Sequence, residues 1–488
     1  MTSAMPFDGE PERFDLVVVG GGAAGERGAA QAAYFGKRVA VVERRLEPGG
    51  ATVHTGTLPS KTLREAALFL SGYRQRDLYG VSVEVAPDLE VAKLIARKNT
   101  VRELETDRML HNLERHGVEL MHGEARLLDA STVEVANDAG ARRRLSADVI
   151  LLVTGSSPFR PPGIPFGDPD VHDSDTILEI DRRPASLAVL GGGVVGCEYA
   201  SMFAALGTEV HLIERREPLL PQLDGEIVER MTAGMRDLGV VFHLGERAET
   251  VVRSGDALVC AMPSGARVAA EKVLVTAGRV GNTAGLGLEE LGVATDDRGR
   301  IVVDESFATT VPSVYAAGDV IGSPALASTS MEQARVAICR AFGFDYKLEV
   351  AELLPFGVYT IPEVSCVGLS EQDAAARGLD VVIGRAVFRE NARGAIIGDR
   401  EGMTKLVFDR ASRRLVGCHC VGERASELVH VGHAVMTLHG TVETFIEMVF
   451  NYPSLTETYK YAAYDALAKL GPLEETGVAR PRPPREGG

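Results

Sequence analysis

FDLVVVGGGAAGERGAAQAAYFG, which spans residues 14–36, is a valine-rich run that ends in glycines and continues into alanine-rich sequence. The apolar run is typical of a buried parallel strand, and the alanine-rich part favours a helix. The next segment, KRVAVVE at 37–43, has the pattern of a second buried strand. The segments together predict a strand–helix–strand unit whose first turn lies at the glycines.

The same unit occurs again at SLAVLGGGVVGCEYASMFAALGTEVHLIE, residues 186–214. The two copies align without gaps, and the first glycine and the final glutamate are 23 residues apart in both. The matched positions are Gly20, Gly22, Gly25 and Glu43 in the first copy and Gly191, Gly193, Gly196 and Glu214 in the second. Chance explains one glycine cluster easily, but not two in the same register.

Each copy carries the G-x-G-x-x-G pattern between a predicted strand and a predicted helix. The glycines let the backbone approach a pyrophosphate, the helix N-terminus offers it unpaired N–H groups, and the acid accepts hydrogen bonds from a ribose. The sequence therefore predicts two dinucleotide sites. A flavin (FAD) that stays bound beside a nicotinamide nucleotide, NAD(P)H, that comes and goes would allow hydride transfer between them.

The rest of the chain suggests three domains. Residues 149–165 form a strand that ends in a glycine turn and a proline-rich connection, typical of a domain crossing. After about residue 350, alternating runs such as MTKLVFD predict an antiparallel α+β domain. The predicted fold is α/β, with two Rossmann-like domains and a C-terminal α+β dimerisation domain. The predicted ranges are 13–160 with 280–348 for FAD, 161–279 for NAD(P), 349–470 for the interface, and 1–12 and 471–488 as flexible termini.

Composition excludes several classes of protein. A net charge of −16 argues against nucleic acid or an anionic membrane as a partner, because both repel an acidic surface. No apolar run reaches the roughly 18 residues of a membrane span, and no secretory signal is visible. The six scattered cysteines favour a reducing, cytoplasmic setting. Cys418 and Cys420 resemble half a metal site, but they are expected to share one face of a strand, and we expect no metal.

Five further stretches match a known family: residues 49–64, 326–337, 359–371, 417–436 and 450–463. With the two fingerprints, they make the chain resemble the pyridine nucleotide–disulfide oxidoreductases from about residue 14 to 470, most closely their soluble transhydrogenase branch. The resemblance implies a homodimer that binds FAD and uses NAD(P)H.

The resemblance also implies roles for individual residues. Lys61 is expected near flavin N5, paired with Glu198, where a cation stabilises negative charge on the ring. The implied FAD contacts are Gly20, Gly22, Gly25, Glu43, Thr52, Lys61, Ala125, Thr154, Gly155 and Asp319. The implied NAD(P) contacts are Gly191, Gly193, Gly196, Glu198, Glu214, Arg215 and Gly278. The implied catalytic residues are Lys61, Glu198, Tyr452 and Glu457, the last two reaching the flavin of a partner subunit.

The chain departs from the family pattern at two places. Thr52 and Thr57 occupy the positions of the redox-active cysteine pair, and a threonine hydroxyl forms neither a thiolate nor a disulfide. Tyr452 stands where the family has a histidine base, although the acid that orients this base is present as Glu457. Tyrosine, with an ordinary pKa near 10, is a poor base at neutral pH. The loop that carries Thr52 and Thr57 is called the altered loop below. His54 lies in this loop, and it has two interpretations: a contact to the flavin or an acceptor, or a residue that packs the loop.

Three functions are compatible with a flavin site that lacks thiols. The first is hydride transfer between NADPH and NAD⁺ through FAD, as in a soluble transhydrogenase. The second is NAD(P)H:quinone reduction, and the third is a non-catalytic FAD-binding role. Glu214 favours NADH, because a carboxylate accepts from both ribose hydroxyls and repels a 2′-phosphate. Arg215 and Arg216 are suited to that phosphate, but they also fit a solvated strand end.

Overall fold

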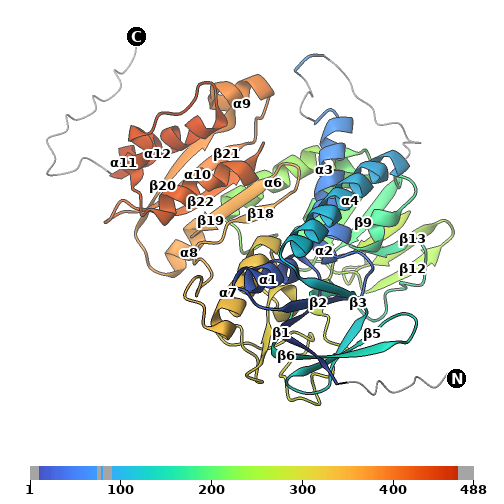
Figure 1. Cartoon of the computed structure of the whole chain (residues 1–488). Helices are drawn as coiled ribbons and strands as arrows, with labels where there is room; N and C mark the ends of the chain where they lie inside the picture. Colours follow the sequence, from blue (N-terminus) through green and yellow to red (C-terminus); the bar gives the residue numbers. More distant parts are fainter. Residues whose placement is uncertain (1–9, 74–77, 81–90, 471–488) are drawn as a thin grey trace, which may run out of the picture. The chain divides into compact units, whose positions relative to one another are not determined.

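The computed structural model describes residues 10–73, 78–80 and 91–470 (Figure 1). The chain forms two compact units. The first contains Met1–Ser71, Glu84–Glu217 and Val240–Glu352, and the second contains Gly72–Val83, Pro218–Gly239 and Leu353–Gly488. Apart from 10–12, the termini expected to be flexible lie outside the described residues. The predicted division into three domains stays a prediction. The two units differ from it most clearly at Pro218–Gly239, which groups with the C-terminal part of the chain.

The first unit contains a seven-stranded sheet built on the first repeat. Its order is β3-β2-β1-β6-β5-β4, and β17 pairs with β6. The strands are β1 (Glu12–Val19), β2 (Val39–Glu43), β3 (Glu119–His122), β4 (Glu124–Leu127), β5 (Thr132–Ala136), β6 (Arg142–Leu152) and β17 (Val314–Ala316). The helices that accompany this sheet are α1 (Ala23–Tyr34), α2 (Gly50–His54), α3 (Thr57–Leu70), α4 (Val91–Arg115) and α7 (Ala327–Phe342), with the short helix η3 (Gly318–Ile321).

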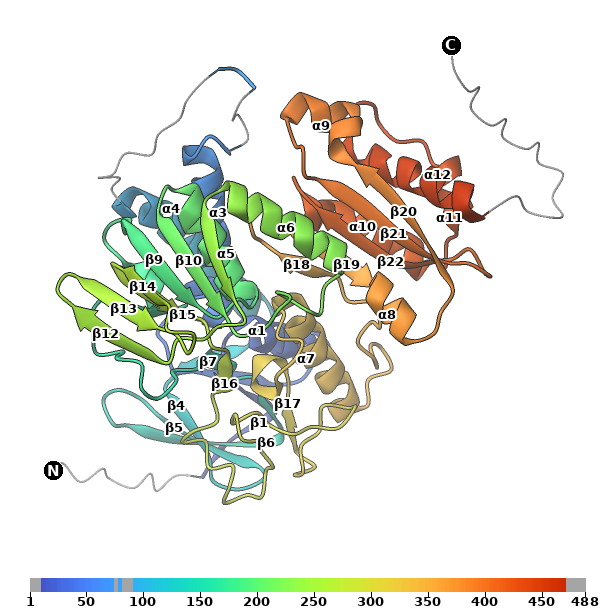
Figure 2. The same cartoon turned by 180° about the vertical axis from the view of Figure 1, so that it is seen from behind.

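The second repeat builds a separate parallel sheet in the same unit, with the order β11-β10-β9-β15-β8 (Figure 2). Its strands are β8 (Val171–Asp173), β9 (Ser186–Leu190), β10 (Glu209–Glu214), β11 (Val240–Leu244) and β15 (Lys272–Val275). Helix α5 (Val194–Ala205) joins β9 to β10, and the short helix η2 (Thr176–Glu179) follows β8. A three-stranded antiparallel sheet is added by β12 (Thr250–Ser254), β13 (Ala257–Ala261) and β14 (Arg267–Ala270). The two strand–helix–strand units are therefore confirmed.

The chain passes between these two sheets along a two-stranded ribbon. β7 (Ser156–Pro158) lies on the outward connection and pairs antiparallel with β16 (Arg279–Gly281) on the return. Asn282 fastens the ribbon, because its side-chain amide donates to the carbonyl of Thr154 at 2.9 Å and its carbonyl oxygen accepts from Ser157 at 2.7 Å. The proline-rich connection seen in the sequence is thus one half of a paired crossing.

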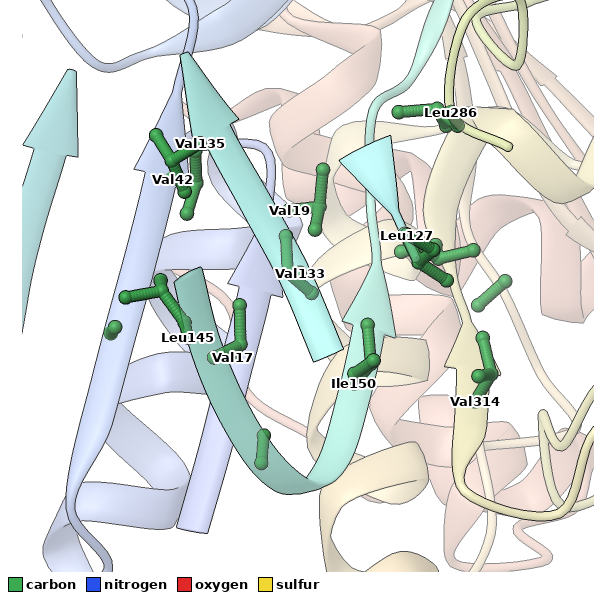
Figure 3. Close-up of a cluster of buried hydrophobic side chains, with 14 of the residues drawn as sticks. Val17, Val19, Val42, Leu127, Val133, Val135, Leu145, Ile150, Leu286 and Val314 are labelled. Carbon is green, nitrogen blue, oxygen red and sulfur yellow. The ribbon is translucent and has the colours of Figure 1, made fainter. Parts of the chain in front are cut away.

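Buried aliphatic side chains from the strands of the first sheet form one apolar cluster (Figure 3). Val17, Val19 and Val42 come from parallel strands, and Val133 and Val135 come from the antiparallel pair beside them. Burying a side chain of this size stabilises the fold by about 1.5–3 kcal/mol. The continuous apolar runs of the sequence reflect this position, because both faces of the central strands are covered.

The second unit contains a five-stranded antiparallel sheet of order β18-β19-β22-β21-β20, which shares one apolar core with several of the helices of this unit (Figure 1). The strands are β18 (Phe356–Val358), β19 (Val364–Gly368), β20 (Val381–Val387), β21 (Met403–Asp409) and β22 (Leu415–Val421). The helices are α6 (Gly225–Asp237), α8 (Glu371–Ala376), α9 (Ala392–Ile397), α10 (Ala425–Thr437), α11 (Val442–Glu447) and α12 (Thr458–Leu470), with the short helices η4 (Phe388–Glu390) and η5 (Leu455–Glu457). This confirms the predicted α+β domain. No helix of the described residues has the length and apolar character needed to cross a membrane.

A buried lysine ties α6 to this antiparallel sheet. Only 2% of the Lys405 side chain is exposed, and its Nζ donates to Asp224 at 2.9 Å and to Glu371 at 2.8 Å. Burial acts to lower the pKa of Lys405, but these acceptors outweigh burial and leave the pKa above its ordinary value. The charge is therefore retained inside the fold and pairs with three carboxylates, those of Asp224, Glu226 and Glu371.

Replacing Lys405 with methionine is expected to lower the free energy of unfolding of this unit by about 3–5 kcal/mol, because it leaves the buried carboxylate of Asp224 without its cation. Urea denaturation measures the loss. The control is Lys469→Met, which removes an exposed pair with Asp465 and should cost less than about 1 kcal/mol. Equal losses in the two variants would contradict a stabilising role for the buried pair.

Candidate dinucleotide and flavin site

The two glycine turns have the same backbone geometry. Gly20 and Gly191 both have a φ of +113°, which L side chains rarely adopt. A Cβ on Gly25 would lie 1.9 Å from the carbonyl oxygen of Gly20, and a Cβ on Gly196 would lie 1.9 Å from that of Gly191. In each strand–helix–strand repeat the helix therefore packs directly on the turn that precedes it. A side chain at Gly25 or Gly196 would separate the helix from this turn.

Both helix N-termini can receive an anion. Helix α1 begins after Gly22 and α5 begins after Gly193, and neither of these glycines can supply a capping side chain. The first-turn N–H groups are therefore available to a pyrophosphate, which the partial positive charge of the helix end also attracts. Both sites therefore fit the pyrophosphate of a dinucleotide, and the assignment of FAD to α1 and of a nicotinamide nucleotide to α5 stays a prediction.

In each strand–helix–strand repeat, a glutamate lies at the end of the second strand. Glu43 accepts from the N–H groups of Gly21 at 2.7 Å and Arg45 at 2.9 Å. Glu214 accepts from those of Gly192 at 2.6 Å and Arg216 at 2.8 Å. Both carboxylates are thus oriented by backbone groups of the fingerprint, beside the position that a ribose would occupy.

Within the first unit, a lysine–glutamate pair joins a helix beside the sheet of the first repeat to a helix of the second repeat. Nζ of Lys61 in α3 donates to Oε2 of Glu198 in α5 at 2.8 Å. Lys61 is partly exposed and Glu198 is buried. A fixed cation of this kind can stabilise negative charge that develops on a ring beside it. These two residues are 137 positions apart, and only folding brings them together.

The loop before Lys61 carries hydroxyl groups at the two positions where the resemblance led us to expect cysteines in related proteins. Thr52 lies in α2 and is partly buried, whereas Thr57 begins α3 and is exposed. Nε2 of His54 lies 3.0 Å from the carbonyl oxygen of Pro48, so the ring nitrogen is the donor. A Cβ on Gly49 would also meet this ring. Of the two readings of His54, this contact favours loop packing.

The remaining predicted FAD residues lie on several elements of the same unit. Asp319 in η3 accepts from Ser156 at 3.2 Å and from Ser330 at 3.4 Å. The hydroxyl of Thr154 donates to the carbonyl of Asn282 at 2.7 Å, and Gly155 follows with a φ of +71°. Ala125 lies in β4, within the sheet of the first repeat. Gly278, predicted to contact NAD(P), follows β15 and has a φ of +111°.

Tyr452 and Glu457 belong to the second unit. The side chain of Tyr452 is exposed, with a relative accessibility of 74%. Glu457 accepts from the amide of Asn391 at 3.2 Å and from the hydroxyl of Tyr461 at 3.3 Å. This glutamate therefore accepts hydrogen bonds from an amide and a phenol.

The cysteines have the character of packing residues. All six are free thiols, and burial raises the pKa of Cys197, Cys260 and Cys366 to about 12 each. Cys418 and Cys420 are buried in the core of the second unit, where their sulfur atoms lie 3.4 Å and 3.7 Å from the hydroxyl of Tyr459. In the described part of the chain, no three histidine, cysteine or acidic side chains are arranged to hold a metal ion.

Comparison with known proteins accounts for this arrangement. The model of the pyridine nucleotide-disulphide oxidoreductase family matches residues 14–334, and that of its dimerisation domain matches residues 354–463. The chain belongs to this family. It is therefore an FAD-dependent oxidoreductase of pyridine nucleotides, with a C-terminal dimerisation domain.

Several curated members of the family are similar over almost their whole length. The soluble pyridine nucleotide transhydrogenase of Mycobacterium bovis is 44% identical over 463 residues, which cover 95% of this chain and 99% of the relative. That of Yersinia enterocolitica is 37% identical, covering 94% of this chain and 98% of the relative. The predicted family is confirmed, and its transhydrogenase members are among the similar proteins.

Solved structures of the family share the fold. LpdA from Mycobacterium tuberculosis superposes with a TM-score of 0.85 at 27% identity, covering 93% of this chain and 99% of that chain. The HOCl-induced flavoprotein disulfide reductase RclA from Escherichia coli, solved as a Cu(II) complex, gives a TM-score of 0.83 at 26% identity, with the same coverage. The predicted fold class is thus confirmed.

Some polar contacts at this family site were not predicted from the sequence. Nε of Arg216 donates to Glu214 at 3.0 Å, while the predicted NAD(P) contact of Arg215 stays a prediction. Asp175 and Arg279 face each other at the ends of β8 and β15. Both belong to segments that follow buried strands, and this position at the carboxyl end of a parallel sheet is the signal that would have found them.

Proposed function

We propose that this chain transfers hydride between NADH or NADPH and a second nicotinamide nucleotide, as a soluble transhydrogenase, with no cysteine between the flavin and the acceptor. The pair formed by Lys61 and Glu198 carries the proposal, because it joins the altered loop to the helix of the second fingerprint. Bound FAD would supply the hydride-transfer chemistry between the two nicotinamides. The chain's own residues would hold the nucleotides and keep a cation beside the ring.

Two observations support electron transfer that does not pass through cysteine sulfur. Thr52 and Thr57 carry hydroxyls that cannot be oxidised to a disulfide. Cys197, the cysteine next to Glu198 in the sequence, is fully buried and its pKa is raised to about 12, so it stays a thiol at neutral pH. Only a thiolate attacks a disulfide or a flavin, so such a thiol is inert.

We further propose that the enzyme works as a cytoplasmic homodimer. The matched dimerisation domain and the exposed position of Tyr452 support this arrangement, in which Tyr452 and Glu457 would approach the partner's flavin. Tyr452 then contributes a contact surface rather than a base. We also propose that no metal takes part.

The assay that tests the function supplies two donor–acceptor combinations to the purified holoenzyme. One contains NADPH and thio-NAD⁺, and the other contains NADH and a benzoquinone without oxygen. We expect much faster turnover of the nucleotide combination. The reverse result would replace transhydrogenation with quinone reduction, a second candidate favoured by the small hydroxyl side chains of the altered loop. Inactivity with every combination would favour a non-catalytic flavoprotein.

The contact between Arg216 and Glu214 bears on the choice of nucleotide. Burial acts to raise the pKa of Glu214, but hydrogen bonds from Arg216 and Gly192 outweigh burial and hold the pKa below its ordinary value. The carboxylate therefore stays charged and favours the ribose hydroxyls of NADH. Half of the Arg216 side chain is exposed, which leaves it able to turn toward a 2′-phosphate. We propose that both nucleotides bind here, with NADH favoured.

Replacing Arg216 with glutamine is expected to lower kcat/KM for NADPH by about 10-fold to 100-fold, the effect of one charged hydrogen bond. The value for NADH should stay within a few fold, because Glu214 keeps its backbone donors. Steady-state kinetics with each nucleotide measures the change, and Arg247→Gln, an exposed arginine in the same unit, is the control. An equal loss for NADH and NADPH would contradict this role of Arg216.

A further inference from the structure

The order of strands around the second fingerprint gives the nucleotide a direction. In a doubly wound sheet the ligand lies at the carboxyl ends of the strands, where the strand order reverses, here between β9 and β15. Glu214 ends β10 on one side of that point, so the adenosine ribose lies on this side. The other end of the nucleotide must therefore extend toward the ends of β15 and β8.

Two opposite charges stand at those ends. Asp175 follows β8, and Arg279 lies four residues beyond β15. Nη1 of Arg279 lies 4.0 Å from Oδ1 of Asp175, and the two side chains are 29% and 28% exposed. That distance is too long for a hydrogen bond. Both groups therefore keep hydrogen-bonding capacity toward a third group that lies against them.

Arg279 is held in a fixed orientation. Its Nε donates to the hydroxyl of Ser156 at 2.7 Å, and its Nη2 donates to the carbonyl of Ser156 at 2.6 Å. The same serine hydroxyl donates to Asp319 at 3.2 Å. Two of the guanidinium nitrogens are thus anchored to the crossing ribbon, and Nη1 is the one that faces Asp175.

Asp175 is a carboxyl group with incomplete solvation. It accepts from the hydroxyl of Ser174 at 3.4 Å, and it also has a hydrogen bond with Thr55 of the altered loop. Burial raises the pKa of Asp175, the negative charge of Asp173 adds to the rise, and Arg279 opposes it. An additional N–H donor would stabilise this carboxylate.

We propose that Asp175 and Arg279 form the seat of the nicotinamide carboxamide, with Asp175 accepting from the amide N–H and Nη1 of Arg279 donating to the amide oxygen. The inference rests on the proposed use of nicotinamide nucleotides. A carboxylate beside a guanidinium offers an acceptor and a donor side by side, which matches the edge of a primary amide. Holding this amide fixes the rotation of the ring about its glycosidic bond. The reactive carbon is thereby aligned before hydride transfer.

The test uses a ligand that lacks the amide donor. NAD⁺ and its 3-acetylpyridine analogue, in which a methyl ketone replaces the carboxamide, are each titrated into the oxidised holoenzyme by calorimetry. We expect the unaltered enzyme to bind NAD⁺ at least about 10-fold more tightly than the analogue, from the lost charged hydrogen bond. In Asp175→Ala this preference should disappear because NAD⁺ binding weakens, while binding of the analogue stays within a few fold.

A second variant and a control complete the design. Asp175→Asn keeps the size of the side chain and one acceptor oxygen, so it should retain a smaller preference if the alanine variant does not fold. Glu179→Ala removes a 74% exposed acid from the turn after Asp175 and should leave the preference unchanged. An unchanged preference in folded Asp175→Ala would overturn the inference. Failure of the unaltered enzyme to be reduced by NADH or NADPH would instead overturn the proposed function.

Discussion

Flavin reduction by NADH is expected to slow by about 10²–10³-fold when Lys61 is replaced with methionine, the usual cost of removing one preorganised electrostatic group from a reaction centre. The reason is the loss of the cation that Glu198 holds at 2.8 Å. Methionine preserves the length and apolar stem of lysine, so packing of α3 should change little. Stopped-flow absorbance of the flavin band measures the rate directly.

Two comparison variants separate charge from packing. Lys61→Arg retains a cation and should recover a large part of the rate. Lys347→Met removes a partly exposed lysine that pairs with Glu332 in the same unit. NADH should reduce the flavin of this variant at the same rate as that of the unaltered enzyme. If Lys61→Met reduced its flavin within threefold of the unaltered enzyme, the lysine would have no part in the transfer.

The two glycine fingerprints should fail independently. Gly25→Ala and Gly196→Ala each place a Cβ 1.9 Å from a backbone oxygen, so the helix has to move away from its turn. We expect Gly25→Ala to purify without flavin, because the pyrophosphate cradle of α1 is lost. Gly196→Ala should remain yellow and be reduced by dithionite, but reduction by NADH or NADPH should fall by at least about 100-fold, since the cradle of α5 is lost.

Each of these glycine variants is the control for the other, because the local geometry is the same in both turns. The flavin content follows from the visible spectrum, and nucleotide reduction follows from anaerobic mixing. Loss of flavin from Gly196→Ala, or normal flavin content in Gly25→Ala, would show that the assignment of the two sites is wrong.

Local sequence patterns predicted the parts of the molecule that depend on neighbouring residues. The turn geometry at Gly20 and Gly191 is set within a few residues by glycine's conformational freedom, so spacing alone revealed both dinucleotide units. The continuous apolar runs in the sequence also indicated a sheet that is covered on both faces. These local features are sufficient to predict the fold class.

Polar contacts between residues far apart in the sequence could not be predicted from local patterns. The pairing of Lys61 with Glu198 was expected only through family resemblance, because no local pattern links residues 137 positions apart. Asp175 and Arg279 were missed for the same reason, since their meeting depends on β8 and β15 lying side by side. The hydrogen bond from Arg216 to Glu214 also could not be predicted from the sequence, because Arg215 and Arg216 both follow Glu214 directly.

The most direct test of the proposed chemistry counts the electrons that the oxidised enzyme accepts. An anaerobic titration with dithionite, followed by the flavin absorbance and by a thiol assay after each addition, supplies the count. With Thr52 and Thr57 in the loop, we predict that two electrons per FAD complete the reduction and that no new thiols appear. Uptake of two further electrons, with the release of two thiols per flavin, would reveal a redox disulfide and contradict direct transfer from the flavin.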